Sequence, residues 1–187
     1  TFGLNGVGVG GIQAVKELTS GLITLPGGVL VGMLRKWWGW LLGICIGASG
    51  LGSLLMGISP AYVLLLIGVA VVSVSHSLWH LPAAASLSHH FASRRGAMLS
   101  FHGVGGSIGD VAGPLITGAL LLVMGWRGIL SIYAIAPILM AFMAVWVFKG
   151  IGDVKEDDDK TAGLAERLAM TKALFRSRLL QGMTAVR

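Results

Sequence analysis

Six acidic, basic or histidine side chains stand inside long apolar stretches of this sequence, where such groups are unusual. They are Lys16, Glu17, His76, His80, His102 and Asp110. Taking a charge into an apolar medium costs free energy unless the group is paired or reaches water, so residues of this kind are candidates for function. Asp110, near the middle of its stretch, could be a proton carrier or cation site. It could equally be a structural carboxylate bonded to a neighbouring helix.

Lys16 and Glu17 are adjacent in the first of these stretches. Adjacent residues project about 100° apart on a helix, so we predict that this lysine and this glutamate do not pair on one face. One of the two is expected to face a cavity or a partner helix. A functional role and structural pairing both stay open.

His76 and His80 are four residues apart and therefore lie on one face of a helix, within a serine-rich region. Imidazole titrates near neutral pH, so this face could line an aqueous path. A zinc-protease helix would need a glutamate after His76, and Ser77 stands there. We therefore expect cavity-lining or hydrogen-bonded histidines, with no metal and no cofactor. His102, near the end of its stretch, is a further candidate.

The composition identifies the elements that must position these groups. The chain has 187 residues, of which 55% are hydrophobic and 12% are charged, and its mean hydropathy is +0.82. Soluble domains have about 25% charged residues, so this chain has too few polar residues to cover a surface that faces water. The net charge of +6 does not indicate nucleic-acid binding, because no aromatic and basic binding face is visible. Cys45 is the single cysteine, so no disulfide framework is expected.

Five stretches are long enough to cross a bilayer, which takes about 20 apolar residues. They lie at 9–34, 38–58, 62–85, 97–124 and 128–148. A backbone in lipid must satisfy its own hydrogen bonds, so these stretches are expected to be helices. The sequence thus predicts an all-α, polytopic membrane protein, with a bundle of about five transmembrane helices in residues 1–149.

Residues 150–187 have a different character and are predicted to be cytoplasmic. Residues 153–160 are a charge run, expected to be a solvated linker. Residues 162–180 show the pattern of a basic amphipathic helix on the inner leaflet, and the last residues could instead open a further span. The chain starts at Thr1 without a signal-peptide pattern, so we expect its natural start to be missing.

Basic residues predict the orientation of the bundle, because cytoplasmic loops are enriched in lysine and arginine. Arg35 and Lys36 follow the first stretch, and Arg94 and Arg95 follow the third, where His89 and His90 are also expected in the loop. The alternate connections hold one cation, Arg127. We expect the basic connections and the C-terminal segment in the cytoplasm, and the protein in the plasma membrane of a prokaryote.

Glycines recur at every fourth position in three places. These are Gly28 with Gly32, then Gly39, Gly43 and Gly47, and then Gly105, Gly109 and Gly113. The spacing places small residues on one helix face, where neighbouring backbones can approach closely. A dinucleotide-binding loop is the weaker interpretation, because no strand precedes these glycines and no acidic ribose partner follows.

The segment 109–118, GDVAGPLITG, resembles the glycine-proline motif in the fifth helix of many major facilitator superfamily transporters, especially proton-coupled exporters. The motif residues are Gly105, Gly109, Gly113, Pro114 and Gly118. The segments 79–85, 94–97 and 125–127 resemble flanking parts of the same fold, and the branch of fosmidomycin-resistance-type exporters is similar. The resemblance covers helices two to six. It implies a partial helix bundle in the lipid bilayer, a small-molecule substrate, a coupling proton and a missing remainder of the same transporter, and no enzyme.

Under this resemblance the loop after the first stretch belongs to the inner gate. The gate residues would be Gly28, Gly32, Arg35, Lys36, Arg94 and Arg95. The chain departs from the family pattern here, because Gly32 stands where the family has an aspartate and Arg35 where it has a second glycine. The charge pairing of that aspartate across the gate is therefore in doubt.

Two alternatives to transport come from other classes of protein. The segment 47–50, GASG, imitates the nucleophile motif of rhomboid-like serine proteases, with Ser49 as the nucleophile, and Trp126-Arg127 imitates their loop dipeptide. The dipeptide should precede the serine, and here it follows. A non-catalytic membrane scaffold is the other alternative.

Overall fold

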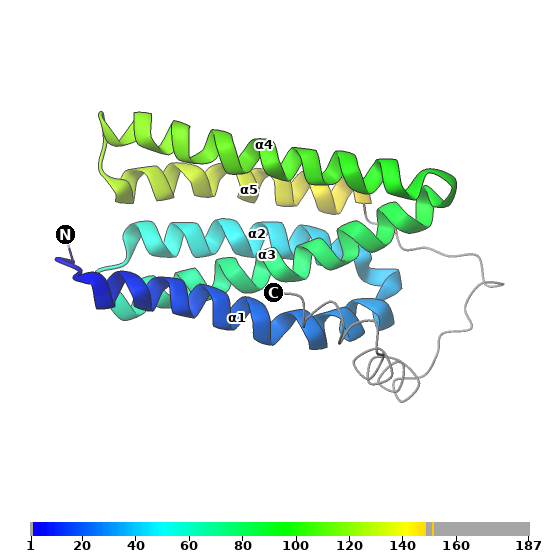
Figure 1. Cartoon of the computed structure of the whole chain (residues 1–187), viewed down its shortest axis with the longest axis horizontal. Helices are drawn as coiled ribbons and strands as arrows, with labels where there is room; N and C mark the ends of the chain where they lie inside the picture. Colours follow the sequence, from blue (N-terminus) through cyan, green and yellow to red (C-terminus); the bar gives the residue numbers. More distant parts are fainter. Residues whose placement is uncertain (1, 149–150, 152–187) are drawn as a thin grey trace, which may run out of the picture.

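The computed structural model describes residues 2–148 and residue 151, and every element in that part of the chain is a helix. The elements are α1 (Gly6–Met33), η1 (Arg35–Trp37), α2 (Trp38–Ile58), α3 (Tyr62–His90), η2 (Ala92–Arg94), α4 (Arg95–Leu121) and α5 (Trp126–Phe148). Figure 1 shows the five long helices running back and forth along one axis. Among the described residues, four helices are long and apolar enough to span a membrane, and the bent α1 makes up to five. This confirms the predicted fold class.

The first helix is bent, although its sequence was predicted to form one continuous span. Its two parts, Gly6–Thr24 and Pro26–Met33, meet at an angle of 46°. Proline lacks a backbone N–H and its ring clashes with the preceding turn, so it bends a helix at this kind of position. Pro26 therefore accounts for the bend.

Helix α2 is the centre of the bundle, and its largest interfaces are with α5 and α3. Glycines on α2 allow the close contact with α5. A Cβ atom on Gly50 would lie 2.7 Å from Ile138 Cγ1 and 3.0 Å from the Ala134 carbonyl oxygen. Gly43 and Gly47 of α2 face Val145 and Ala141 of α5, as expected for glycines that form a packing face. Close backbone approach is the main source of attraction between helices in lipid, where burial of apolar surface drives little.

Helix α3 lies against α1 along its length. Tyr62 donates a hydrogen bond of 2.6 Å to the Gly8 carbonyl near the start of both helices, and Ser20 and Ser77 share one of 2.7 Å further along. These two contacts show that α1 and α3 run in the same direction. The polar residues of the two helices are thereby held at matching depths.

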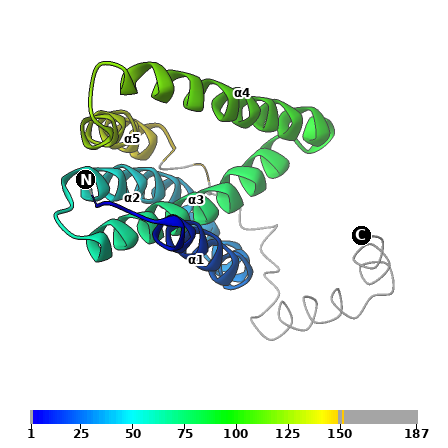
Figure 2. The same ribbon diagram turned by 60° about the vertical axis from the view of Figure 1, so that its left-hand side comes forward.

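Helix α4 is the least covered element of the bundle. It contacts α3 and α5 at few positions, and Figure 2 shows that α3 and α4 move apart with distance from the turn that joins them. No residue of α4 is buried, and a Cβ atom on Gly105, Gly109 or Gly113 would meet nothing within 4 Å. The predicted packing face of α4 thus has no partner within the described part of the chain, and the same holds for Gly28.

The basic connections lie at one end of the bundle, as Figure 1 shows, and α3 reaches further toward them than predicted. The sequence placed His89 and His90 in a loop, but α3 continues to His90 and includes both in its last turn. Helix α4 likewise begins at Arg95 and leaves only Phe91 and the short η2 between the two helices. The predictions for residues 150–187 lie outside the described residues, apart from residue 151.

At the end of the bundle opposite the basic connections, Arg127 connects the start of α5 to the end of α2. Its guanidinium donates hydrogen bonds to the carbonyl oxygens of Gly57 and Ser59, at the C-terminus of α2. The guanidinium also lies over the rings of Phe2 and Trp126, and the Arg127 Cζ atom is 5.0 Å and 4.7 Å from the two ring centres. Arg127, the one cationic side chain at this end among the described residues, therefore caps a helix, where a positive charge is favoured by the helix dipole.

Arg127→Ala is expected to lower the free energy of unfolding by about 1.5–3 kcal/mol, the range for hydrogen bonds that involve a charged group. Thermal unfolding in detergent micelles would measure the change. Arg94→Ala is the matched control, because Arg94 is exposed in η2. Equal losses in the two variants would contradict the capping role of Arg127.

Candidate functional site

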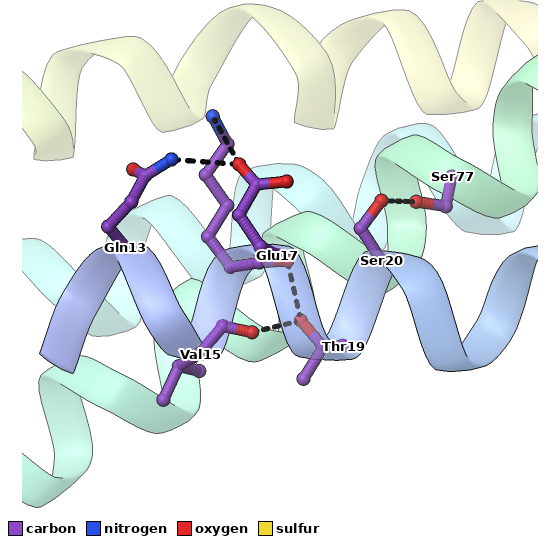
Figure 3. A network of polar contacts seen from close by, with 7 residues as sticks. Gln13, Val15, Glu17, Thr19, Ser20 and Ser77 are labelled. Carbon is purple, nitrogen blue, oxygen red and sulfur yellow. Dashed lines mark hydrogen bonds and ion pairs between the residues drawn. The ribbon is translucent and has the colours of Figure 1, made fainter. Parts of the chain in front are cut away.

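The middle of α1 carries a polar group of three side chains, drawn in Figure 3. Glu17 accepts a hydrogen bond of 2.8 Å from the Gln13 amide, and its carboxylate lies 3.8 Å from Lys16 Nζ. The prediction that Lys16 and Glu17 do not pair is therefore wrong. Their Cα–Cβ bonds diverge, but the two side chains are long enough to meet above the helix surface. Both remain largely exposed, at 59% for Lys16 and 63% for Glu17.

On the neighbouring helix α3, the serines and the histidines of the serine-rich run differ in burial. Ser73 and Ser75 are buried in the bundle, while His76 is exposed. Ser77 bonds to Ser20 of α1, as Figure 3 shows. Since Ser20 lies one turn after Glu17, His76 and Glu17 lie at similar depths on adjacent helices. The hydrogen bond between Ser77 and Ser20 thus connects the helix that carries His76 with the helix that carries Lys16 and Glu17.

His76, His80 and His102 lie close together, and we call them the histidine cluster. The Nε2 atoms of His76 and His80 are 3.0 Å apart, as their spacing of four residues predicts. His80 Nδ1 lies 3.5 Å from His102 Nε2, across the α3–α4 contact. The Trp79 ring packs against His80 and His102, with ring centres 4.9 and 5.3 Å apart. The sequence did not reveal that His102 joins the pair, because this contact depends on how α4 folds back.

A cavity of about 320 Å³ opens beside the histidine cluster, between α2, α3, α4 and α5. Trp79 and His102 form part of its wall, together with Met140, Met143 and Phe148. Most of the wall is apolar, and His102 and Ser86 supply polar atoms. Binding sites for small molecules commonly have this combination of an apolar wall with a few polar groups.

Asp110 lies in the middle of α4, away from the histidine cluster. It is eight residues beyond His102, or about 12 Å along the helix. Its side chain is exposed, and within the described chain it has no hydrogen-bond or ion-pair partner. Within the described residues, Asp110 therefore does not make the bond to a neighbouring helix that a structural carboxylate would make.

The predicted gate residues collect at the basic end. Arg35 Nη2 donates to the ring of His89, 2.6 Å away at Nε2, and the guanidinium lies over Trp38, 5.6 Å from the ring centre. Its Nε is buried without a partner. Arg95 donates to the Ser88 carbonyl at 3.3 Å, while Lys36 is exposed. Glu17 and Asp110, the acidic residues of the described chain, both lie far along their helices from this end.

The described residues hold no group of three or more His, Cys, Asp or Glu side chains arranged to bind a metal ion. Ser49, the nucleophile of the protease alternative, donates its hydroxyl to the Ile46 carbonyl of its own helix at 2.7 Å. A hydroxyl bonded to its own helix in this way is common for serines in membrane helices. The geometry of Ser49 therefore matches a packing role.

Two known proteins that are similar to this chain are both named as transport proteins. The uncharacterized MFS-type transporter YfnC of Bacillus subtilis is 28% identical over 131 residues, which cover 68% of this chain and 32% of YfnC. The efflux pump aflT of Aspergillus parasiticus is 29% identical over 120 residues, which cover 64% of this chain and 23% of aflT. The matches thus span about a third or less of these relatives. No solved structure matches the chain.

The relatives do not test the resemblance to fosmidomycin-resistance-type exporters, which stays a prediction. A sequence profile of the Major Facilitator Superfamily matches residues 1–186 and therefore nearly the whole chain. Together with the apolar helices, this match identifies an integral membrane protein of a transporter class and argues against the protease alternative. The chain belongs to the Major Facilitator Superfamily.

Proposed function

We propose that the intact protein moves a small solute across the membrane by alternating access, in exchange for protons, and that it acts as an exporter. The observation that carries this proposal is the position of its titratable groups. Lys16, Glu17, His76, His80 and Asp110 lie inside membrane-spanning helices and are all exposed in the described bundle.

Exposure of charge at this depth has a physical consequence. Lys16 and Glu17 lie near the middle of α1, and more than half of each side chain is open. A charged pair facing hydrocarbon would lose its hydration, which disfavours that arrangement strongly. Both groups are stable where water or other polar protein groups reach them. A water-filled path between helices meets this requirement, and transport proteins use such paths.

The remainder of the same transporter would cover the open face of α4. The matched part of this chain corresponds to 32% of YfnC, so a protein of similar length would have further helices to supply. Gly105, Gly109 and Gly113 form a smooth strip on α4 that meets nothing within 4 Å. Such strips pair with other helices in membranes. The glycine-proline motif is therefore proposed as a contact surface for those helices.

Direction and coupling rest on separate support. The Aspergillus relative is named an efflux pump, which favours export. Asp110 and Glu17 are the carboxylates within the described spans, so they are the proposed proton carriers, and Lys16 Nζ lies 3.8 Å from the Glu17 carboxylate. In exchange transport, protonation of such a group alternates with solute binding.

The orientation follows from charge. Gly28, Gly32, Arg35, Lys36, Arg94 and Arg95 would form the inner gate, with the four cations near the lipid headgroups of the cytoplasmic leaflet. The C-terminal segment would then be cytoplasmic. The Bacillus relative supports the plasma membrane of a bacterium as the location.

Solute-linked proton movement in liposomes tests the proposed function. The full-length protein would be reconstituted with a pH-sensitive dye inside, and a panel of small solutes would be added under an imposed pH gradient. At least one solute is expected to accelerate the collapse of the gradient, and a protonophore should abolish its accumulation. Accumulation that persists with protonophore present would contradict proton exchange. Liposomes with heat-denatured protein serve as the control.

A further inference from the structure

The histidine cluster connects two different surroundings. At one end His102 forms part of the wall of the 320 Å³ cavity. At the other end His76 is exposed on α3, next to Ser77 and its hydrogen bond with Ser20 of α1. His80 lies between the two other histidines and contacts both.

The contacts of His80 use its two ring nitrogens separately. Nε2 faces His76 at 3.0 Å, and Nδ1 faces His102 at 3.5 Å. An imidazole bonded in this way can accept a proton on one nitrogen and release one from the other. We propose that His102, His80 and His76 form a proton relay between the cavity and the polar face of α1 and α3. This relay rests on the proton coupling proposed above.

The transfer conserves atoms and charge. A proton on His102 Nε2 passes to His80 Nδ1, and the N–H bond at His80 Nε2 breaks as that proton passes to His76 Nε2. His102 becomes neutral, His76 becomes an imidazolium ion, and His80 ends as the opposite neutral tautomer. Passage of a proton in the other direction restores the first tautomer of His80. The relay uses no other reactant.

The surrounding charges favour a single shared proton. The elements packed against α3 bring few titratable groups to the cluster: α4 contributes His102, α1 carries Lys16 and Glu17, and α2 has Cys45 as its only titratable side chain. Two imidazolium ions with ring centres 4.4 or 5.6 Å apart would repel each other. Glu17 of α1 lies at a similar depth to His76, as the Ser20–Ser77 hydrogen bond between the two helices shows.

Nitrogen NMR of the full-length protein in liposomes, labelled with ¹⁵N-histidine, tests the relay without any solute. The wild-type protein is expected to show nitrogen–nitrogen correlations from His80 to both neighbours. His80→Gln should remove both and slow proton exchange between His76 and His102 at least tenfold. His102→Gln should remove one correlation and keep the other, which separates a broken link from a collapsed structure. His90→Gln is the matched control on the same helix and should change nothing.

Two results would overturn the relay. One is a wild-type protein without either correlation, and the other is proton exchange at His76 that His80→Gln leaves unchanged. Failure of the proposed function looks different. In that case the correlations are present in the wild-type protein, but no solute moves protons in the liposome assay.

Discussion

Asp110→Asn in the full-length protein is expected to reduce proton-driven solute accumulation by about a hundredfold or more, the scale on which loss of a proton-transferring group is felt. An amide keeps the size and polarity of the carboxyl group but takes up no proton at neutral pH. Exchange of solute for solute, which moves no net proton, is expected to continue. Accumulation in reconstituted liposomes under a pH gradient is the measurement.

Ser107→Ala provides the control for Asp110→Asn, because Ser107 is another exposed polar residue of α4. Its accumulation should equal that of the wild-type protein. Glu17→Gln identifies the second proposed carrier in the same assay. Unchanged accumulation in Asp110→Asn would remove Asp110 as the proton carrier and would leave Glu17 or the histidine cluster in that role.

Gly50→Leu is expected to prevent stable folding, the largest structural effect of any single change proposed for this chain. Even a Cβ atom at this position would lie 3.0 Å from the Ala134 carbonyl oxygen and 3.1 Å from the Ile138 nitrogen. Backbone atoms cannot move aside as a flexible side chain can, so α2 and α5 must separate. Overpacking of an interior typically costs about 1–3 kcal/mol, and a leucine against backbone atoms lies at or above that range.

Gly113→Leu is the matched comparison on α4, where nothing lies within 4 Å. In the 187-residue chain expressed alone, Gly50→Leu should abolish the monodisperse peak in detergent, and Gly113→Leu should leave it unchanged. In the full-length protein both variants are expected to lose this peak, because we propose that further helices of the transporter cover α4. A full-length Gly113→Leu protein that folds and accumulates solute normally would contradict that assignment.

Much of the fold could be predicted from the sequence, because in lipid an apolar stretch of sufficient length has few alternatives to a helix. The stretch 38–58 coincides with α2. The predicted ends of α3 and α4 differ from the observed ones by two to five residues, and at the α3–α4 connection the reason is that polar residues such as His89 were assigned to the loop. A helix that extends past the hydrocarbon can carry such residues in its last turn.

The candidate site was only partly predictable. The spacing of His76 and His80 fixed their contact, because helical geometry is local. The contact of His102 with His80 depends on the turn between α3 and α4, which residue spacing does not determine. The Lys16–Glu17 pair does not follow from the directions of the Cα–Cβ bonds, because both side chains are long enough to meet although those bonds diverge.

We propose that the polar face of α1 and α3 lines a water-filled path, and cysteine labelling tests this most directly. His76→Cys and Phe142→Cys would be placed one at a time in the full-length protein, in a background without other cysteines. In that background Cys45, the single and buried cysteine of these 187 residues, is replaced by alanine. Both test positions are exposed within the described bundle, and Phe142 projects from α5 beside an apolar groove. The cysteine at position 76 should react at least tenfold faster with a membrane-impermeant cationic thiosulfonate than the one at position 142, because thiolate forms in water and not in lipid. Equal reactivity at the two positions, or an unreactive cysteine at position 76, would contradict the account.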